Sequence, residues 1–586
     1  MTSFPPPAQD AMPTTRGLNF FLEDPSFALL CEHVMGPAVF ELARPHLVAL
    51  GAVAGDELDA LAAEADRNPP VLRSFDAQGR RVDEVITHPA YRRMEAIAFG
   101  RFGLAAMAHR PGVLGFPEPA PQVVKYALSY LFAQSEFGLL CPVNMTDSCA
   151  RMLRAFGSAE LQARYLPHLT ATDPETLSQG TQWMTERTGG SDVGASTTVA
   201  RRDADGQWRL WGDKWFTSVA NADVALTLAR PEGAPGGTRG LAMFLVPKRL
   251  PDGSRNAWTI NRLKDKLGSR SMATGEVTYA GAVGYVVGAL DSGFRQMMDM
   301  VNGSRLSNAM RAAGIMRRAL LESLVHARQR VAFGRPLAEL PLLRSNLLSM
   351  LLDAEAAATV ILNGAALLDR REAGSAEARA LARVWTPLAK YWITLRARDV
   401  AAEAMNVRGG NGYVEEWVNP RLLRDAYLGA IWEGSANVVA LDVQRAIVKD
   451  RGLDVLGAFI GERLGRVAEP RAKRVVDLAR AGLEAVTRQC AGWAGQPAAE
   501  RELSARPVAD ALYHLLAGAL LLAEGQSRRE QGRDHRKLLV GGLYLSRWLE
   551  SRPAASPPFT ARQIEWLLPL AEGRSIDASA LADLEA

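Results

Sequence analysis

A glutamate stands beside an apolar segment in the stretch AIWEGSANVVALDVQRAIV (430–448). Ser435 is a plausible N-cap of the helix that this stretch predicts, and a helix N-terminus favours a neighbouring carboxylate, so Glu433 could be an ordinary capping group. Alternatively, burial between Ile431 and Trp432 would oppose ionisation of Glu433 and raise its pKa, as a general base requires. The stretch alone leaves both interpretations open.

Two upstream segments carry groups that could hold a flat, polar ring. The loop QWMTERTGGSDVGASTT (182–198) places Thr185 and Ser191 around two adjacent glycines, and such loops offer N–H and hydroxyl donors to a ring edge or a phosphate. In GDKWFTSV (212–219), Phe216 could stack on a cofactor while the hydroxyl of Ser218 reaches one of its nitrogens. A plain turn and ordinary strand packing are the simpler explanations of the two segments.

Two further segments suit a diphosphate. HARQRVAFGRPL (326–337) gathers arginines around Phe333, and the planar guanidinium fork matches phosphate oxygens. NVRGGNGYVEEW (406–417) has a glycine-rich turn that permits close approach of another backbone or a pyrophosphate. It is not a G-x-G-x-x-G after a strand, so a Rossmann site is not predicted. A solvated basic helix end and a helix C-cap remain the alternatives.

The spacing of apolar residues divides the chain into helical and extended regions. Helical spacing covers roughly 27–169, a period of two covers 181–287 with an Asp-Gly turn at 205–206, and helical spacing returns over 292–450 and 451–586. The predicted architecture is mostly α with a β-rich centre and an extra helical domain. Its divisions are a disordered leader (1–17), a helical domain (18–178), a β domain (179–288), a helical bundle (289–450) and a C-terminal helical domain (451–586).

Composition bounds the class of protein. The 586 residues are 48% hydrophobic and 23% charged, which is typical of a globular chain of several domains. The four cysteines are scattered, so neither a disulfide framework nor a C-x-x-C metal site is predicted. The first residues lack the charged and apolar regions of a secretory signal, and the longest apolar run, 511–523, is too short to span a bilayer. We expect a cytoplasmic protein with no metal and no membrane segment.

The order of the motifs is more informative than any one of them. The chain resembles the acyl-CoA dehydrogenase superfamily, and within it the AidB-like branch of adaptive-response flavoproteins, over about residues 18–450. The resemblance rests on NFFLEDP, CPVNMT, MTERTGGSDV, GDKWFTSV, LPDGSRNAWTINRLKDKLGSRS, RQRVAFGRPL, RGGNGY and IWEGSANVVALDV. It implies an N-terminal helical domain, a central β-barrel and a C-terminal four-helix bundle, with FAD between them.

The resemblance assigns roles residue by residue. Glu433 matches the catalytic base, and Ser191 and Arg305 match positions that contact the acyl-CoA. The implied FAD contacts are Thr185 and Ser218 at the flavin ring, Phe216 against it, Arg330 and Phe333 near the diphosphate, Asn406, Gly409 and Gly410 at the ADP moiety, and Ser435 and Asn437 after the glutamate. Because the family usually supplies the arginine–phenylalanine pair from a neighbouring subunit, a homo-oligomer, dimer or tetramer, is expected. Arg187 stands where the family usually has proline, and Ser218 where it usually has threonine.

The implied reaction is α,β-dehydrogenation of an acyl-CoA thioester, with Glu433 removing the α-proton and a hydride passing to flavin N5. The electron acceptor could be an electron-transfer flavoprotein or oxygen. The alternative is a flavoprotein that binds DNA through residues 451–586, where 19 Lys and Arg face 17 Asp and Glu. This balance argues against phosphate-backbone binding, and we interpret the local basic patches around 471–474 and 528–537 as solvated helix faces. A third interpretation is that residues 451–586 only extend an oligomer interface, which the apolar run 511–523 supports.

Overall fold

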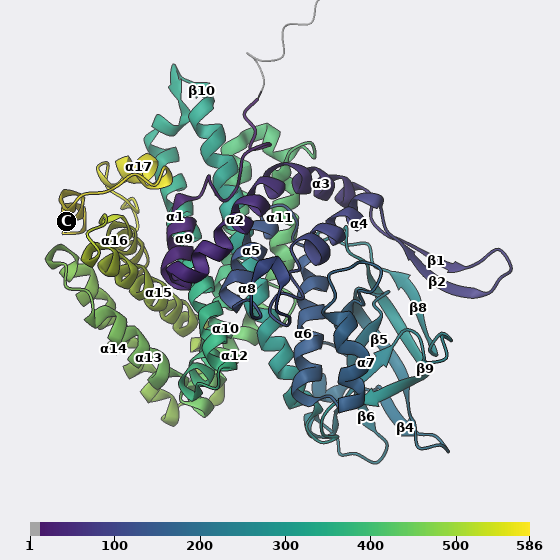
Figure 1. Ribbon diagram of the computed structural model, residues 1–586. Helices are drawn as coiled ribbons and strands as arrows, with labels where there is room; N and C mark the ends of the chain where they lie inside the picture. The colour runs from purple at the N-terminus through teal and green to yellow at the C-terminus, as the bar shows by residue number, and fades with distance from the viewer. Residues whose placement is uncertain (1–11, 586) are drawn as a thin grey trace, which may run out of the picture.

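The structure, a computed structural model, describes residues 12–585. Figure 1 shows a long helical body, a β domain at its lower right and the C-terminal helices at its left. The predicted fold class, mostly α with a central β-barrel, is confirmed. The predicted domain boundaries at 178, 288 and 450 each fall between two regular elements.

The first region is helical, with one exception. Its helices are α1 (Pro25–Met35), α2 (Pro37–Val53), α3 (Asp59–Arg67), α4 (Pro89–Glu95), α5 (Gln122–Ala133), α6 (Leu140–Phe156) and α7 (Ala159–Leu169). Helix α1 begins with the Asp24 side chain accepting from the Phe27 N–H and Pro25 at the first position, a strong start signal. A hairpin of β1 (Val71–Phe75) and β2 (Arg81–Ile86) interrupts the helices, which the helical spacing did not predict. The Asp83 carboxylate accepts from the Ile260 N–H at 3.1 Å, so the hairpin is fixed to the β domain.

The β domain is a closed barrel with two additional strands. Its strands are β3 (Gly180–Trp183), β4 (Val199–Arg202), β5 (Trp208–Ser218), β6 (Val224–Pro231), β7 (Ala242–Pro247), β8 (Trp258–Leu263) and β9 (Thr274–Val286). The pairings β6–β4–β5–β9–β7–β6 form the closed ring, while β3 pairs with β6 and β8 with β9. The predicted Asp-Gly turn joins β4 to β5, with Gly206 at φ 78°, a value that favours glycine. Trp183, Phe244 and Tyr279 fill the barrel core.

The bundle that follows supplies the elements around Glu433. Its elements are α8 (Gly293–Gln329), the short strands β10 (Val331–Ala332) and β11 (Arg335–Pro336), α9 (Pro341–Glu372), α10 (Ala376–Arg408), α11 (Val418–Gly429) and α12 (Ala436–Asp450). Figure 1 shows the β10–β11 hairpin projecting beyond the helices at the top of the view.

The C-terminal region is a further set of helices. They are α13 (Gly452–Gly465), α14 (Lys473–Ala491), α15 (Ala498–Glu530), α16 (Arg536–Leu549) and α17 (Leu567–Ala571). The apolar run 511–523 lies in α15 and is buried within the same chain, where α15 contacts α16 and α9. Because this run packs inside the chain, it gives no support to the interpretation that the C-terminal region extends an oligomer interface.

Two expectations about the chain ends and apolar segments need correction. Most of the predicted disordered leader lies outside the described residues, but residues 12–17 are fixed against the bundle, where the Thr15 hydroxyl donates to Glu322 and the Pro13 carbonyl accepts from Arg408. Three helical stretches are long and apolar enough to cross a membrane by length and composition: Pro37–Arg67, Pro341–Glu372 and Ala498–Glu530. In the last two, 89% and 83% of the most apolar window is buried inside the fold, so both are core helices.

Candidate active site

Glu433 lies in a strained turn between α11 and α12. It has φ 58°, in the left-handed region that non-glycine residues rarely adopt, and Gly434 follows at φ 96°. The turn aims the carboxylate at the barrel, where it accepts from Gln182 Nε2 of β3 at 3.4 Å. Backbone strain of this kind persists only where the surrounding structure enforces it, and it concentrates at functional sites.

Two buried cations hold the turn in place. Arg305 of α8 donates through Nε to the Glu433 carbonyl at 3.1 Å and pairs through Nη1 with Asp442 of α12 at 2.5 Å. Lys390 of α10 donates through Nζ to the Gly434 carbonyl. The turn is therefore fixed through its main chain, and within the described part of the chain the Glu433 carboxylate forms no direct ion pair.

Aromatic side chains form the wall beside the carboxylate. Trp432 donates through its indole N–H to Asn308 Oδ1 at 2.8 Å and stacks on Phe137 with 5.6 Å between ring centroids. The Arg311 guanidinium lies 4.6 Å from the centroid of the Trp432 ring. The predicted apolar wall thus includes Trp432 and carries a buried cation, but Ile431, which we expected in it, is 62% exposed.

The electrostatic setting favours a base. Burial raises the pKa of Glu433, while Arg305, Arg311 and Lys390 partly oppose this shift by favouring the carboxylate. Burial also lowers the pKa of Lys390 to about 7, with Arg305 acting in the same direction. The group can therefore ionise, yet it binds a proton more readily than an exposed glutamate.

The barrel places the predicted flavin-ring residues near this carboxylate. The Ser218 carbonyl on β5 accepts from the Thr181 hydroxyl at 2.8 Å and from the Trp183 indole at 3.0 Å, which fixes Ser218 beside the strand that carries Gln182. The Phe216 ring is 54% exposed, with the Lys264 ammonium 4.7 Å from its centroid. An aromatic face is therefore open on the same side of β5 as Ser218.

The loop after β3 carries three more residues of interest. The Thr185 carbonyl accepts from the Trp215 N–H at 2.8 Å, so its hydroxyl lies in the same part of the barrel. Ser191 is exposed further along the loop. Arg187, which stands where proline is usual, lies with its guanidinium 5.1 Å from the Trp215 ring centroid.

The predicted diphosphate and ADP residues form a separate cluster. Arg330 follows α8 directly, 25 residues after Arg305, so roughly 37 Å of helix separates them at about 1.5 Å per residue. Phe333, at the tip of the β10–β11 hairpin, is 91% exposed and has φ 55°. Because Arg408 of α10 bonds Glu322 of α8, the ends of the two helices lie together.

Asn406, Gly409 and Gly410 belong to this same end of the bundle and are exposed. No atom lies within 4 Å of a Cβ placed on Gly409 or Gly410, so the backbone there is open to a ligand. The chain thus brings the ring residues to Glu433 and carries the diphosphate and ADP residues to a distant end.

Ser435 and Asn437 lie at the start of α12. Both are exposed, and Ser435 is the N-cap residue, as predicted. Its hydroxyl makes no capping hydrogen bond, however, so the cap position is occupied without the expected bond. The two side chains remain available to other partners.

Several residues of this centre were absent from our sequence prediction. The folded chain brings three distant residues into contact with the Glu433 turn or its wall: Gln182, Lys390 and Arg311. It also pairs Asp442 with Arg305, which holds the turn. Gln182 begins the loop motif already singled out, so it was open to prediction, whereas nothing near Lys390 or Arg311 in sequence signals their position. Among residues 12–585, no group of three or more His, Cys, Asp or Glu side chains could hold a metal ion.

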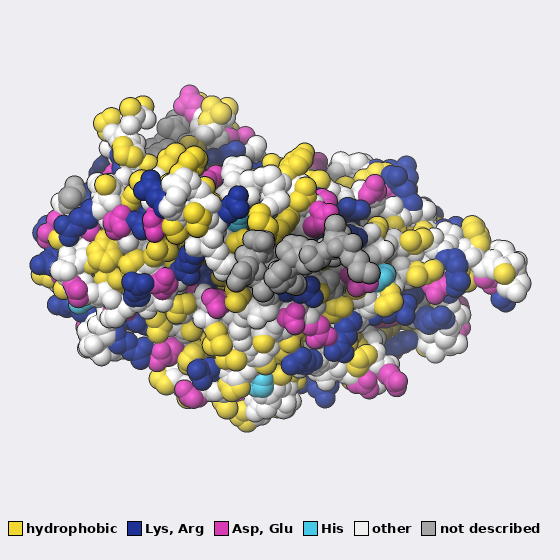
Figure 2. All heavy atoms as spheres, turned by 90° about the horizontal axis from the view of Figure 1, so that it is seen from above, with side chains coloured by type: hydrophobic (Ala, Val, Ile, Leu, Met, Phe, Trp, Pro, Cys, Tyr) yellow, Lys and Arg dark blue, Asp and Glu magenta, His cyan; other side chains and the backbone are white. Residues whose placement is uncertain are grey.

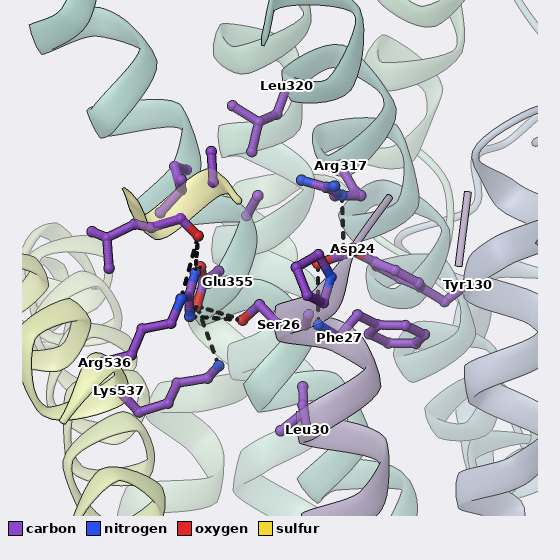
Figure 3. Close-up of a pocket in the computed structure, with 16 residues that line it drawn as sticks. Asp24, Ser26, Phe27, Leu30, Tyr130, Arg317, Leu320, Glu355, Arg536 and Lys537 are labelled. Atoms are coloured by element: carbon purple, nitrogen blue, oxygen red, sulfur yellow. Dashed lines mark hydrogen bonds and ion pairs between the residues drawn. The ribbon is translucent and has the colours of Figure 1, made fainter. Parts of the chain in front are cut away.

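The predicted basic patch around 528–537 is largely neutralised. Arg536 and Lys537 are each 1% exposed and pair with Glu355 of α9, as Figure 3 shows. Arg528 pairs with Asp534, and Arg533 with Glu32. Our interpretation of this patch as a solvated helix face is therefore wrong for its buried members, which join the C-terminal helices to the bundle. Figure 2 shows Lys and Arg interspersed with Asp and Glu over the face seen from above.

Three family models match successive parts of the chain: the adaptive response protein AidB N-terminal domain (11–175), the acyl-CoA dehydrogenase middle domain (181–282) and the acyl-CoA dehydrogenase C-terminal domain (291–448). The putative acyl-CoA dehydrogenase AidB of Escherichia coli is 40% identical over 68% of this chain and 73% of its own length. Acyl-CoA dehydrogenase family member 11 of Caenorhabditis elegans is 32% identical over 80% and 78%.

Solved structures show the same likeness. The Caenorhabditis elegans protein ACDH-11, solved in complex with C11-CoA, matches with a TM-score of 0.86 and 27% identity over 95% of this chain and 94% of its own. The structure described as Bd2924 apo-form matches with a TM-score of 0.78 and 33% identity over 88% and 99%. The predicted resemblance is confirmed: this chain belongs to the acyl-CoA dehydrogenase family and to its AidB-like branch.

Proposed function

We propose that this protein is an FAD-dependent acyl-CoA dehydrogenase in which Glu433 is the base that removes the α-proton of an acyl-CoA thioester. The observation that carries the proposal is the strained, partly exposed turn that aims the Glu433 carboxylate at Gln182 of β3. A carboxylate with a raised pKa, held in a fixed position, has the two properties that a general base for α-proton abstraction needs.

The residues present fit FAD. Among residues 12–585, the Gln182 Oε1 atom is buried without a hydrogen-bond partner, the Phe216 ring is half exposed, and the backbone at Gly409 and Gly410 is open. Thr185, Phe216 and Ser218 would hold the ring, with Ser435 and Asn437 beside it. Arg330, Phe333, Asn406, Gly409 and Gly410 would hold the diphosphate and ADP moiety. When bound, FAD supplies the hydride acceptor for the β-carbon.

The separation of the two residue clusters supports an oligomer. Arg330 lies roughly 37 Å of helix away from Arg305, so one chain does not enclose both ends of one cofactor. The exposed Phe333 at the tip of a projecting hairpin is suited to reach a neighbouring copy. A homo-oligomer, dimer or tetramer, in which each chain completes its neighbour's site follows from this arrangement.

The chain's own part in the reaction is positioning and proton transfer. Arg305 and Lys390 fix the main chain of the turn, so the Glu433 carboxylate is held before substrate arrives. Trp432 and Phe137 exclude water from one side of the carboxylate. The carboxylate then takes the α-proton. Ser191, exposed on the barrel loop, would contact the CoA chain.

Anaerobic titration of the holoenzyme with a panel of acyl-CoA thioesters tests the proposal. We expect at least one thioester to bleach the flavin absorbance, and peroxide measurement in air then distinguishes oxygen from an electron-transfer flavoprotein as acceptor. Failure of every thioester to bleach the flavin would remove the dehydrogenase assignment. We propose no DNA-binding role, because the basic residues at 528–537 are engaged in ion pairs.

A further inference from the structure

Arg311 is a fully buried cation that has no anionic partner among residues 12–585. Its side chain is 1% exposed, its Nε donates only to the Ser307 carbonyl at 3.4 Å, and its Nη1 has no hydrogen-bond partner. Other fully buried arginines in the chain are paired: Arg318 with Asp59 and Glu322, and Arg536 with Glu355. An unpaired guanidinium is among the most costly groups to bury, so its retention calls for a functional reason.

The position of Arg311 places this charge in the catalytic centre. Its guanidinium lies 4.6 Å from the Trp432 ring centroid and 5.1 Å from that of Phe137. Its positive charge acts to lower the pKa of both Glu433 and Cys141, against the effect of burial. Cation–π contacts recover only part of the cost of desolvation, and neither aromatic ring supplies hydrogen-bond acceptors for Nη1. The unmet requirement is an oxyanion with acceptors in the plane of the fork.

Two cavities near this part of α8 have polar side chains among the apolar ones in their linings. Ser307 and Met310, helix neighbours of Arg311, line an internal cavity of about 10 Å³ together with Lys125 and Asn144. Lys125 and Asn144 also line a larger cavity of about 630 Å³ between α5, α6, α8 and α9. There the Lys125 ammonium pairs with Asp147 at 2.9 Å. A purely aliphatic acyl tail would gain little from such walls, because burying them without hydrogen bonds carries a penalty.

We propose that the acyl group accepted at this site carries an anionic substituent, a carboxylate or a phosphate, that pairs with Arg311. This inference rests on the proposed dehydrogenase function and specifies its substrate class. Arg311 is then a specificity-determining residue, because only the correct substrate supplies the anion that offsets the cost of burying its charge. The rival explanation is that Arg311 acts through Glu433, by keeping the carboxylate ionised, and the two explanations predict different substrate profiles.

Three thioesters of equal acyl length, presented to the wild-type holoenzyme under anaerobic conditions, test the proposal. They are hexanoyl-CoA, adipyl-CoA and a hexanoyl-CoA that carries a phosphoryloxy group on its last carbon. We expect at least one anionic thioester to bleach the flavin with a specificity constant at least about tenfold above that of hexanoyl-CoA, as a charged hydrogen bond provides. The anionic thioester that bleaches the flavin faster shows whether the site prefers a carboxylate or a phosphate.

The outcomes separate this inference from the function on which it rests. Bleaching by hexanoyl-CoA that equals or exceeds that by both anionic thioesters would overturn the inference and leave the dehydrogenase assignment intact. If no thioester bleaches the flavin, the proposed function itself fails.

Variants locate the recognition. In Arg311→Leu, the preference for the anionic thioester should fall by about tenfold to a hundredfold, mainly through weaker binding. Arg311→Lys should restore part of it, because a point charge lacks the planar fork. Arg379→Leu removes an arginine at the rim of the larger cavity and serves as the matched control. Equal losses for neutral and anionic thioesters in Arg311→Leu, or loss of the preference in Arg379→Leu alone, would contradict the assignment.

Discussion

The guanidinium of Arg305 donates to the main-chain oxygen of Glu433 at 3.1 Å while it pairs with the Asp442 carboxylate. A buried ion pair between α8 and α12 thus holds the strained turn that carries the proposed base. This contact also gives Arg305 a second role beside the substrate contact that we predicted. The two roles can be tested separately, because substitution of the buried Asp442 changes the ion pair and leaves the Arg305 side chain in place.

Loosening the ion pair should slow proton abstraction without removing the base. In Asp442→Asn, the carboxylate that orients Arg305 is lost, and we expect the rate of flavin bleaching to fall about tenfold to a hundredfold, since a displacement of about 1 Å costs as much. The apparent affinity for acyl-CoA should change little. Arg445→Ala removes an exposed partner of the same carboxylate and is the matched control. An unchanged bleaching rate in Asp442→Asn would argue against the positioning role.

The dependence of bleaching on pH should report the cations around Glu433. Burial raises the pKa of Glu433, and Lys390 partly opposes the shift, so removal of that charge in Lys390→Met raises the pKa further. Since Glu433 acts as a carboxylate, its ionised fraction falls as pH falls, and the loss of rate should begin at a higher pH in the variant. Burial lowers the pKa of Lys390 to about 7, so its positive charge is present mainly below pH 7. The pH profiles of the wild type and of Lys390→Met should therefore differ mainly below pH 7.

Stopped-flow bleaching between pH 5 and 9 checks this prediction. The midpoint is the measured quantity, because Lys390→Met also loses the bond to the Gly434 carbonyl and lowers the rate at every pH. Lys390→Arg keeps the charge and should keep the midpoint near that of the wild type. A midpoint in Lys390→Met at or below the wild-type value would show that Lys390 does not act on Glu433.

Mixed oligomers test whether neighbouring chains complete each other's sites. A chain with Glu433→Gln lacks its base but still offers Arg330, whereas a chain with Arg330→Ala keeps its base. Each variant alone should be impaired. After the two are unfolded and refolded together, or co-expressed, a heteromeric pair contains one site with both groups intact. We expect recovery of up to about half of the wild-type activity, because at a symmetric interface one of the two sites in each heteromeric pair has both groups. No recovery in verified heteromers would place Arg330 in its own chain's site.

The ion pairs between Glu355 and the C-terminal helices should contribute to stability. Burial alone would raise the pKa of Glu355, but Arg536 and Lys537 lower it to about 2. The stabilisation is therefore present above the carboxyl's unfolded pKa of about 4.5 and is lost as pH falls toward about 2.

Glu355→Gln leaves Arg536 and Lys537 buried without their carboxylate, so we expect a loss of about 3–5 kcal/mol in the free energy of unfolding. Urea unfolding at pH 7 measures it, and Glu32→Gln, at the half-exposed Arg533 pair, should cost under about 1 kcal/mol. Equal effects of the two substitutions would contradict the account of the buried cluster.

Local sequence patterns predicted where the helices and strands lie better than they predicted the tertiary contacts between them. The change of period near 181 and 287 located the barrel, and the Asp-Gly pair at 205–206 located a hairpin, because both signals depend on neighbours in sequence. The β1–β2 hairpin was not predicted, since its exposed strands lack a buried alternating face. It is fixed by the hydrogen bond between Asp83 and Ile260, which is far away in the sequence. Family motifs located Glu433, but only the fold shows Lys390 beside it.

Charge was the least predictable property. The segment around 528–537 has the composition of a solvated patch, yet Arg536 and Lys537 are buried because Glu355, far away in sequence, supplies the compensating charge. For Arg311 the reverse holds, since its Nη1 atom has no hydrogen-bond partner among the described residues. Ion pairing depends on residues brought together by tertiary structure, so residue counts such as 19 against 17 predict little about it.

Anaerobic stopped-flow bleaching of Glu433→Gln tests whether the Glu433 carboxylate removes the α-proton. The amide keeps the size of the side chain and leaves the main-chain bond from Arg305 in place. With the best thioester of the panel, we predict that flavin bleaching falls by at least about a hundredfold while thioester binding persists, in keeping with the contribution of a general base. Bleaching of Glu433→Gln at a rate near that of the wild type would contradict the account.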